Sequence, residues 1–410
     1  MGDLTPSDTQ VPWRGVVLAI TGVQAVLALL TRTMPLFGVA LTARAGMPPE
    51  AVGQLASATA FGSMVFFLWG PEFLRRVEAR RQLQGGLVLA AIALLAGLAP
   101  VWWIMVLAAL AIGLGYGPAT PAGSDVLMRI VPPARRSTIF SIKQAGVPLG
   151  GMVAGMALPL IAAATGMVDA AIAAAAGLAL VTAALLGLWP LSLEPAAADR
   201  AQPFLARMLA LLRAPLRSLP LLATVPELRR TMAAGFTLGI GQGVIMAYFP
   251  VYMTAHVGWS LAAAGALFGL LQALGIAGRI GMGWMADRIG STGRMLVWLC
   301  FLSGATMLLM AGFGPDTPAV WMVLVSCLAG LTVISWNGVF LTGLAEAAPE
   351  GRVGEITGVG TFILFAGFVV TPLVMQGLFA LTGGYAAGMA LAGLAPVTAG
   401  LLLRQSLRRA

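Results

Sequence analysis

Long apolar stretches follow one another along almost the whole chain, and they constrain the fold more than any other feature. We count twelve such runs, most of them about 19 to 27 residues long. A helix of roughly 20 apolar residues spans the hydrocarbon core of a bilayer, and only helices and closed barrels satisfy their backbone hydrogen bonds there. The sequence therefore predicts an all-α integral membrane protein with twelve transmembrane helices.

The composition leaves little that could form a soluble domain. Of the 410 residues, 59% are hydrophobic and only 10% are charged, and the mean hydropathy is +0.93, which is typical of membrane proteins. Cys300 and Cys327 fall within apolar runs, where we expect buried thiols rather than a disulfide or metal pair. The predicted helices begin near Val16, Ala51, Leu83, Val101, Thr138, Val168, Met232, Leu261, Met295, Ala319, Val353 and Tyr385.

The arginines predict the orientation in the membrane. If the N-terminus is cytoplasmic, every arginine outside the apolar runs except Arg44 falls on the cytoplasmic side, where Arg and Lys accumulate in short loops. We expect a multi-pass protein of the cytoplasmic (inner) membrane with both termini in the cytoplasm. Topology and attraction to anionic lipid headgroups then explain the net charge of +9, so no nucleic-acid partner is expected.

A hydrophilic break at residues 190–230 divides the chain into two halves. This segment contains several prolines, six arginines and short amphipathic pieces such as FLARMLALLR, a pattern that predicts a cytoplasmic linker on the membrane surface. We expect residues 1–189 and residues 231–410 to form one six-helix bundle each.

The two halves share landmarks at nearly constant separations of 212 to 216 residues. The matching pairs are Pro35 with Pro250, Gly53 with Gly265, Gly70 with Gly283, and Pro133 and Arg136 with Pro349 and Arg352. Two related, pseudo-symmetric bundles imply a central cavity with a substrate site near the bilayer midplane, which faces each side of the membrane in turn. The repeat thus predicts transport by alternating access.

One loop carries a recognisable motif. Residues 278–294 read GRIGMGWMADRIGSTGR, which resembles the signature G-x-x-x-D-R-x-G-R of the major facilitator superfamily with three residues inserted before the last arginine. The matching positions are Gly283, Asp287, Arg288, Gly290 and Arg294. With the helix count, the repeat and the linker, the resemblance covers essentially the whole chain.

The resemblance implies that Asp287 helps to control opening on the cytoplasmic face. Arg352 and the start of helix 11 are our candidate partners for it. The alternative is that Asp287 only caps a turn. The first half departs from the signature, because after Gly70 it reads PEFLRRVEARR with Leu74 in place of the aspartate. We therefore expect gating to depend on the second copy.

Helix 5 also resembles its counterpart in the family. It begins STIFSIKQAGVPLGGMVAG, in which Gly146, Gly150, Gly151 and Gly155 have spacings that let helices approach closely. The segment lacks the full antiporter form of the family's motif, so we do not infer antiport from it.

Three cations lie inside apolar runs: Arg32, Lys143 and Arg279. A basic residue at mid-helix costs about 2.5 to 3.5 kcal/mol on insertion, and such residues usually face a wet cavity. The available acids, Asp125 and Glu346, are expected near the cytoplasmic ends of helices 4 and 10, where neither is well placed to neutralise Arg32. A positive surplus in a low-dielectric cavity attracts an anion.

The family resemblance favours Arg32 as the anion contact, because an arginine in the middle of helix 1 is similar to the substrate contact of organic-anion carriers in this superfamily. The alternatives are that Arg32 pairs with a neighbouring helix or snorkels to the surface. Lys143, the only lysine in the chain, is a second candidate that could equally snorkel, and Arg279 is a third that could equally be structural.

Uncharged polar residues within apolar runs are further candidates. In the fold that the resemblance implies, helices 1, 4, 7 and 10 line the cavity, although hydrogen bonding between helices is the usual role of such groups. The wider set is Gln24, Tyr116, Gln144, Gln242, Tyr248, Gln272, Trp336 and Asn337. From it we select Tyr116, Gln144, Tyr248, Trp336 and Asn337 as substrate-binding residues.

These observations predict a secondary active transporter for a small organic anion, a carboxylate. The alternative is a drug or metabolite efflux carrier of the same superfamily, but exporters of lipophilic cations usually carry a buried acid. An enzyme is not expected, since there is one histidine and the carboxylates are scattered. No ATP-binding loop, metal or cofactor is expected, and we expect a monomer. Proton symport through Asp125 or Glu346, anion exchange and facilitated diffusion all remain open.

Overall fold

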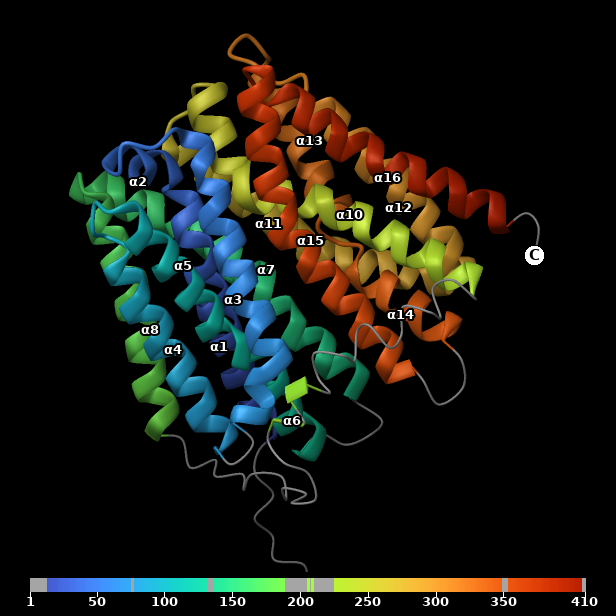
Figure 1. The fold of residues 1–410 in the computed structure, drawn as a ribbon, viewed down its shortest axis with the longest axis horizontal. Coiled ribbons are helices and arrows are strands. Elements are labelled where there is room, and N and C mark those ends of the chain that lie inside the picture. Colours follow the sequence, from blue (N-terminus) through green and yellow to red (C-terminus); the bar gives the residue numbers. More distant parts are fainter. Residues whose placement is uncertain are drawn as a thin grey trace, which may run out of the picture.

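The computed structural model describes residues 13–74, 77–130, 136–188, 205–206, 208–209, 225–348 and 353–407. Within these residues the chain consists of helices and short turns, without a β-strand, and the helices form two bundles side by side (Figure 1). This architecture confirms the predicted all-α membrane fold of two six-helix bundles.

The first bundle contains the elements up to α8. They are α1 (Trp13–Leu36), α2 (Gly38–Arg44), η1 (Pro49–Ala51), α3 (Val52–Phe73), α4 (Ala79–Ala96), α5 (Trp102–Tyr116), η2 (Gly117–Ala119), α6 (Pro121–Ile130), α7 (Arg136–Thr165) and α8 (Val168–Leu188).

The second bundle contains the elements from α10 onward. They are α10 (Pro226–Val251), the π-helix η4 (Tyr252–His256), α11 (Leu261–Ile289), α12 (Thr292–Met310), α13 (Ala319–Thr332), α14 (Asn337–Ala347), α15 (Val353–Thr382) and α16 (Ala386–Leu407).

In the part of the chain that the structure describes, eleven helical segments are long and apolar enough to cross a membrane. The twelfth crossing segment is α4, whose first turns carry Arg80, Arg81, Gln82 and Gln84 and are therefore more polar. Most helices begin within about one turn of the predicted residue. An exception is α10, which begins at Pro226 instead of Met232, because a proline suits the first turn of a helix.

Two crossing segments are interrupted, which the apolar pattern did not predict. The fourth changes from α5 to α6 through the short helix η2, where Gly117, Pro118 and Pro121 weaken the regular hydrogen-bond pattern. The tenth is interrupted between Thr332 and Asn337, so that α13 and α14 are separate helices. The two breaks occupy the same place in the order of helices in each half.

The proposed repeat has matching landmarks at the helix ends. Pro35 is the penultimate residue of α1, and Pro250 is the penultimate residue of α10. Arg136 is the first residue of α7, whereas Arg352 precedes α15 and lies outside the described residues. Most of the predicted linker, residues 190–230, also lies outside the described part, so the boundaries 1–189 and 231–410 stay a prediction.

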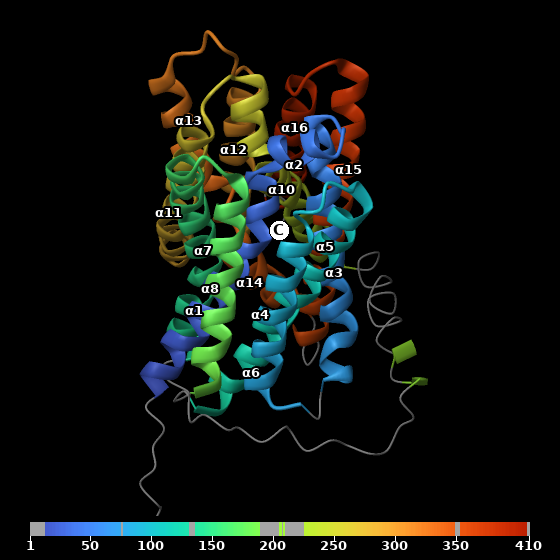
Figure 2. The same ribbon diagram turned by 90° about the vertical axis from the view of Figure 1, so that its left-hand side faces the viewer.

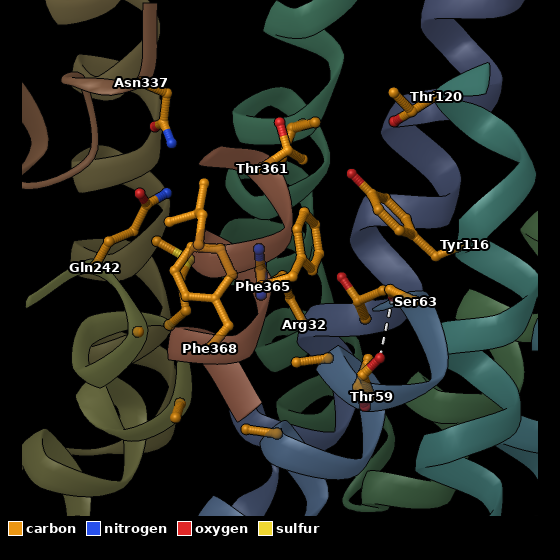
Figure 3. A pocket seen from close by; sticks show the side chains of 18 of the residues that line it. Arg32, Thr59, Ser63, Tyr116, Thr120, Gln242, Asn337, Thr361, Phe365 and Phe368 are labelled. Carbon is orange, nitrogen blue, oxygen red and sulfur yellow. Dashed lines mark hydrogen bonds between the residues drawn. The ribbon is translucent and has the colours of Figure 1, made fainter. Parts of the chain in front are cut away.

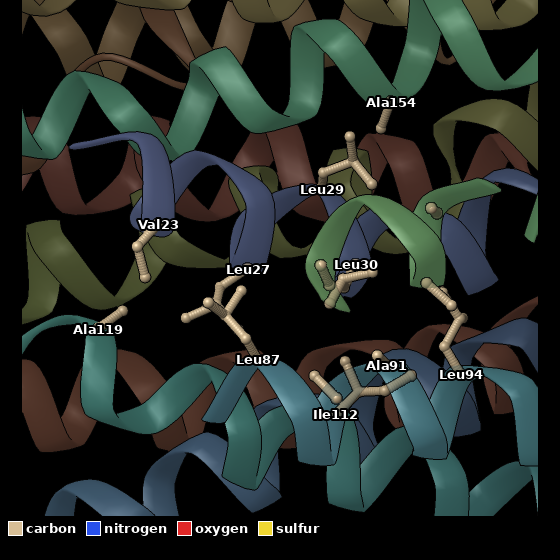
Figure 4. Packing of buried hydrophobic residues seen from close by; sticks show 14 of the residues in the cluster. Val23, Leu27, Leu29, Leu30, Leu87, Ala91, Leu94, Ile112, Ala119 and Ala154 are labelled. Carbon is tan, nitrogen blue, oxygen red and sulfur yellow. The ribbon is translucent and has the colours of Figure 1, made fainter. Parts of the chain in front are cut away.

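Close helix packing holds each bundle together. In the first bundle, Leu27 and Leu30 of α1 pack with Leu87 and Leu94 of α4 and with Ile112 of α5 (Figure 4). Because lipid is as apolar as these side chains, such contacts stabilise mainly through van der Waals packing rather than through exclusion of water.

The glycines of α7 confirm the predicted close approach. A Cβ on Gly150 would overlap the carbonyl oxygen of Ala25 in α1, and a Cβ on Gly155 would lie 2.5 Å from the carbonyl oxygen of Gly265 in α11. One face of α7 therefore packs against its own bundle and another face packs against the second bundle. The other main contacts between the bundles join α3 with α15 and α1 with α10.

The bundles also meet at the end of the molecule that carries α2. Tyr248 donates a hydrogen bond to the carbonyl oxygen of Pro372 (2.6 Å), and Gly53 lies so close that a Cβ there would overlap the Tyr248 hydroxyl. Tyr385 donates a hydrogen bond to Glu50 across the two halves (3.0 Å). These contacts close the α2 end of the interface.

Candidate functional site

A pocket of about 350 Å³ lies between the two bundles. The first bundle contributes α1, α3, α5 and α7 to its wall, and the second contributes α10, α11, α14 and α15. Gln144 and Leu341 line the pocket and are exposed, so it communicates with solvent on the side of α6 and α14. The pocket is therefore open toward the α6 end and closed toward the α2 end.

Arg32 lies at the centre of this pocket (Figure 3). It stands three residues before Pro35 in α1, and its neighbours Thr31 and Thr33 donate their hydroxyl protons back to carbonyl oxygens of the same helix (2.7 and 3.0 Å). The Arg32 Nε is buried and has no hydrogen-bond partner among the described residues. No described acid forms an ion pair with its guanidinium.

Arg279 brings a second cation to the same pocket. Its Nε donates a hydrogen bond of 3.3 Å to the carbonyl oxygen of Ile334, which lies in the break between α13 and α14. Arg32 and Arg279 line this pocket from different bundles. Both guanidinium groups are positively charged, so an anion bound between them would be attracted by both and would offset their mutual repulsion.

No acidic residue lines the pocket among the residues that the structure describes. Glu50 lies at the closed end, where it accepts the hydrogen bond from Tyr385, and Glu346 accepts a hydrogen bond from Thr292 away from the pocket. The side chain of Asp125 lies outside the described residues. The described lining thus carries two positive charges and no negative one.

Polar groups of the first bundle surround Arg32. Tyr116 lines the pocket, and its hydroxyl oxygen accepts a hydrogen bond from Gln24 Nε2 (3.3 Å). Ser63 donates its hydroxyl proton to the carbonyl oxygens of Thr59 and Gly113, both at 3.1 Å. Gln144 completes the set of predicted residues on this wall.

The wall formed by α15 is largely aromatic. Phe365 packs edge-on against Phe67 of α3, with ring centroids 4.8 Å apart, and against Phe368, with ring centroids 5.7 Å apart. Thr361 lies on the same wall (Figure 3). The pocket therefore combines cationic groups with an apolar surface that suits a hydrocarbon chain.

Of the eight predicted substrate-binding residues, five line the pocket: Arg32, Tyr116, Gln144, Arg279 and Asn337. The described lining does not include Lys143. Its side chain is 1% exposed, and its Nζ donates hydrogen bonds to Thr120 O and Ser124 Oγ, both at 2.8 Å. It thus stabilises the break in the fourth crossing segment rather than facing the pocket.

Tyr248 and Trp336 also lie behind the pocket wall in this conformation, and both are 0% exposed. The Tyr248 hydroxyl is engaged with Pro372 at the closed end. Trp336 packs edge-on against Phe340, at 5.4 Å between ring centroids. Neither side chain reaches a bound molecule in the pocket without a change of conformation.

Sequence reasoning missed the contributions of α3 and α15, because the family resemblance directed attention to helices 1, 4, 7 and 10. A signal was present in the spacing. Thr361, Phe365, Phe368 and Pro372 recur every three or four residues and therefore share one face of α15. Thr59, Ser63 and Phe67 do the same on α3.

The gating motif forms the turn between α11 and α12. Gly290 has a φ of 64° and ends α11, and Ser291 caps α12 by accepting a hydrogen bond from the backbone N–H of Arg294 (3.2 Å). The Arg294 guanidinium donates to the carbonyl oxygen of Ile289 (2.9 Å). The geometry of the turn therefore explains why the motif has a glycine at position 290 and an arginine at position 294.

Asp287 and Arg288 are exposed in the last turn of α11, and Gly283 is half-buried earlier in the same helix. Asp287 has no ion pair with a described residue, and its expected partner Arg352 lies outside the described part. The guanidinium of Arg288 lies 5.0 Å from the centre of the Trp284 ring. A Cβ at Gly283 would meet nothing within 4 Å. The role of Asp287 in gating stays a prediction.

Two bundles of membrane-spanning helices around one central pocket define the class of this protein: a polytopic membrane transporter. The sequence pattern of the Major Facilitator Superfamily matches residues 18–372, and the chain belongs to this family.

Named relatives agree with this membership. The chain is 26% identical to an uncharacterized MFS-type transporter of Mycobacterium tuberculosis over 357 residues, which cover 86% of this chain and 76% of the relative. It is 33% identical to the probable nitrate/nitrite transporter NarK2 of the same species over 166 residues, covering 38% of this chain and 40% of the relative.

Solved structures agree in fold. A POT family transporter in complex with 5-aminolevulinic acid superposes with a TM-score of 0.74 at 14% identity, covering 96% of each chain. A bacterial homologue of the human lysosomal transporter Spinster superposes with a TM-score of 0.73 at 15% identity, covering 97% of this chain and 98% of that one.

Proposed function

We propose that the protein is a secondary transporter that moves a small organic anion, a carboxylate, across the cytoplasmic membrane by alternating access. The observation that carries this proposal is the pair Arg32 and Arg279 in a pocket whose described lining contains no acid. A guanidinium binds a carboxylate through two parallel hydrogen bonds. A bound carboxylate therefore supplies the counter-charge that Arg32 lacks.

The rest of the lining favours an organic anion. Phe365 and Phe368 offer an apolar surface on which a hydrocarbon chain can pack. The NarK2 relative is named as a probable transporter of inorganic anions, nitrate and nitrite, which supports a negatively charged cargo. An inorganic oxyanion would use the arginines but not the aromatic wall.

The contacts between the bundles support the proposal of alternating access. The α2 end is closed by Gly53, Tyr248 and Tyr385, and the pocket is open toward α6 and α14. Rocking about the α7–α11 and α3–α15 contacts would open the α2 end and close the other. The arginine distribution supports assigning the open end to the cytoplasm, with both termini there.

Uptake into proteoliposomes tests this function. The purified protein is reconstituted, and influx of labelled acetate, butyrate, succinate, nitrate and a lipophilic cation is measured under imposed pH and voltage gradients in turn. The proposal expects saturable carboxylate uptake. Uptake of nitrate alone would show that the substrate is an inorganic anion and not an organic one. Uptake of the lipophilic cation alone would favour the alternative function, a drug or metabolite efflux carrier. The gradient that drives uptake identifies the coupling ion.

A further inference from the structure

The break in the tenth crossing segment places a helix N-terminus at the pocket. α13 ends at Thr332, and α14 begins at Asn337, which itself lines the pocket. The first backbone N–H groups of a helix have no partner within the helix and carry a partial positive charge. Gly338, in the first turn of α14, is exposed, and a Cβ there would meet no atom within 4 Å.

Two pocket-lining side-chain amides lie beside this helix end, and their oxygen atoms have no hydrogen-bond partner among the described residues. Gln242 is only 7% exposed, and its Oε1 accepts no hydrogen bond from a described residue; the same holds for Asn337 Oδ1. The two amides point toward one another at the edge of the pocket, on the second bundle (Figure 3). An amide oxygen only accepts hydrogen bonds, so it is the NH₂ group of each of these pocket-lining side chains that can donate to an anion.

Arg279 belongs to the same wall. Its Nε donates a hydrogen bond to Ile334 O in the break, three residues before the start of α14, while its side chain lines the pocket. The second bundle thus contributes one guanidinium, two amides and a helix N-terminus. Arg32 and Tyr116 belong to the opposite wall, on the first bundle.

We propose that Arg279, Gln242, Asn337 and the N-terminus of α14 form a second anion subsite, and that the substrate is a dicarboxylate held by one carboxylate on each bundle. The described lining has two positive charges and no acid, so a dianion neutralises it where a monoanion leaves one charge uncompensated. The middle of such a molecule lies against Phe365 and Phe368. This inference rests on the proposed carboxylate transport.

A dicarboxylate also connects binding to the conformational change. Each carboxylate would bind a different bundle, so one molecule bridges the two halves at the pocket. Because a ligand shifts an equilibrium only by its differential affinity for the two states, a bridging ligand favours the state that brings both subsites within its length. A monocarboxylate that contacts one bundle lacks this effect.

Calorimetric titration of the purified protein with succinate and with butyrate at neutral pH tests the subsite. Both ligands have four carbon atoms, and they differ in the second carboxylate. We expect succinate to bind at least about tenfold more tightly. Gln242→Leu and Asn337→Ala should each weaken succinate binding by about tenfold, as expected for a lost hydrogen bond to a charged group, and should change butyrate binding by less than about twofold.

Two further variants separate the subsite from general damage. Gln272→Leu makes the same chemical change at another buried amide with an unpaired Oε1, outside the described pocket lining, and should leave both affinities unchanged. Asn337→Asp places a negative charge in the first turn of α14, where it favours the helix but repels a second carboxylate. It should weaken succinate binding more than Asn337→Ala does.

Equal affinities for succinate and butyrate would overturn the proposal that the substrate is a dicarboxylate. Equal losses of affinity for both ligands in Gln242→Leu and Asn337→Ala would overturn it as well. That second result would mean that the amides bond to one another and support the fold. Binding of neither ligand would instead overturn the proposed carboxylate transport itself. We expect Arg32→Gln to lose binding of both succinate and butyrate. We expect Asn337→Ala to weaken the binding of succinate alone.

Discussion

Lys143 donates a hydrogen bond from its Nζ to the carbonyl oxygen of Thr120, 2.8 Å away, at the break between α5 and α6. Arg279 makes the corresponding contact with Ile334 O at the break between α13 and α14. Both breaks fall in the fourth crossing segment of a six-helix half. Each intramembrane cation outside α1 therefore has a backbone carbonyl at an interrupted helix as a partner.

This placement of Lys143 gives a first prediction. Lys143→Met removes the ammonium but keeps an apolar side chain of similar length, and the Thr120 carbonyl still accepts the backbone N–H of Ser124 (3.0 Å). We expect the dissociation constant for a carboxylate to change by less than about threefold, because the described pocket lining does not include Lys143. A titration checks this. A loss as large as that of Arg32→Met would assign Lys143 to the binding site.

The closed end gives a second prediction. A Cβ at Gly53 would overlap the Tyr248 hydroxyl and lie 2.9 Å from Pro372 O, so Gly53→Ala should force the α2 end apart. Spin labels on cysteines at Ala43 and Asp316, in a chain with Cys300→Ser and Cys327→Ser, report the distance between the two halves at this end. We expect longer distances in Gly53→Ala.

Two controls accompany the distance measurement. Gly22→Ala adds a methyl where nothing lies within 4 Å and should leave the distribution unchanged. Tyr248→Phe, combined with Gly53→Ala, removes the atom that the methyl overlaps and should restore part of the closed population. An unchanged distribution in Gly53→Ala would show that this contact does not close the α2 end.

The positions and number of the helices could be predicted from the sequence, because the length of an apolar run depends only on the thickness of the bilayer. The close approach of α7 through Gly150 and Gly155 could be predicted for a similar reason, since only small residues allow it. Pro35 and Pro250, a matched pair of the predicted repeat, also lie at corresponding helix ends.

The site was only partly accessible from the sequence. Arg32 and Arg279 could be identified because a charge inside an apolar run is conspicuous. The break before Asn337 could not, since residues 333–336, VISW, contain neither glycine nor proline. The burial of Tyr248 and Trp336 behind the pocket wall depends on how the helices rotate about their axes, and apolar composition on all sides leaves that rotation undetermined.

The gating motif gives a third prediction. Asp287 is exposed at the end of α11, next to the α11–α12 turn, and the family resemblance assigns it to control of the cytoplasmic end. Asp287→Asn should therefore slow transport while leaving the affinity for a carboxylate within about twofold. Uptake rates and titration, measured on the same preparation, check this.

The matched control for Asp287→Asn is Asp316→Asn, the same change at an exposed aspartate near the α2 end. This control should leave both the rate and the affinity unchanged. Wild-type turnover in Asp287→Asn would mean that the aspartate serves only the turn between α11 and α12.

Arg32 carries the central claim, and the affinity of Arg32 variants for a carboxylate tests it most directly. Loss of one partner from a desolvated charge pair costs about 2 to 5 kcal/mol, so Arg32→Ala should weaken binding by well over tenfold. Arg32→Lys should recover only part of the affinity, because a single ammonium cannot make the planar two-point contact. Arg44→Ala removes an arginine that is paired with Asp169 (2.5 Å) outside the described pocket lining, and it should bind normally. Wild-type affinity in Arg32→Ala would contradict the account.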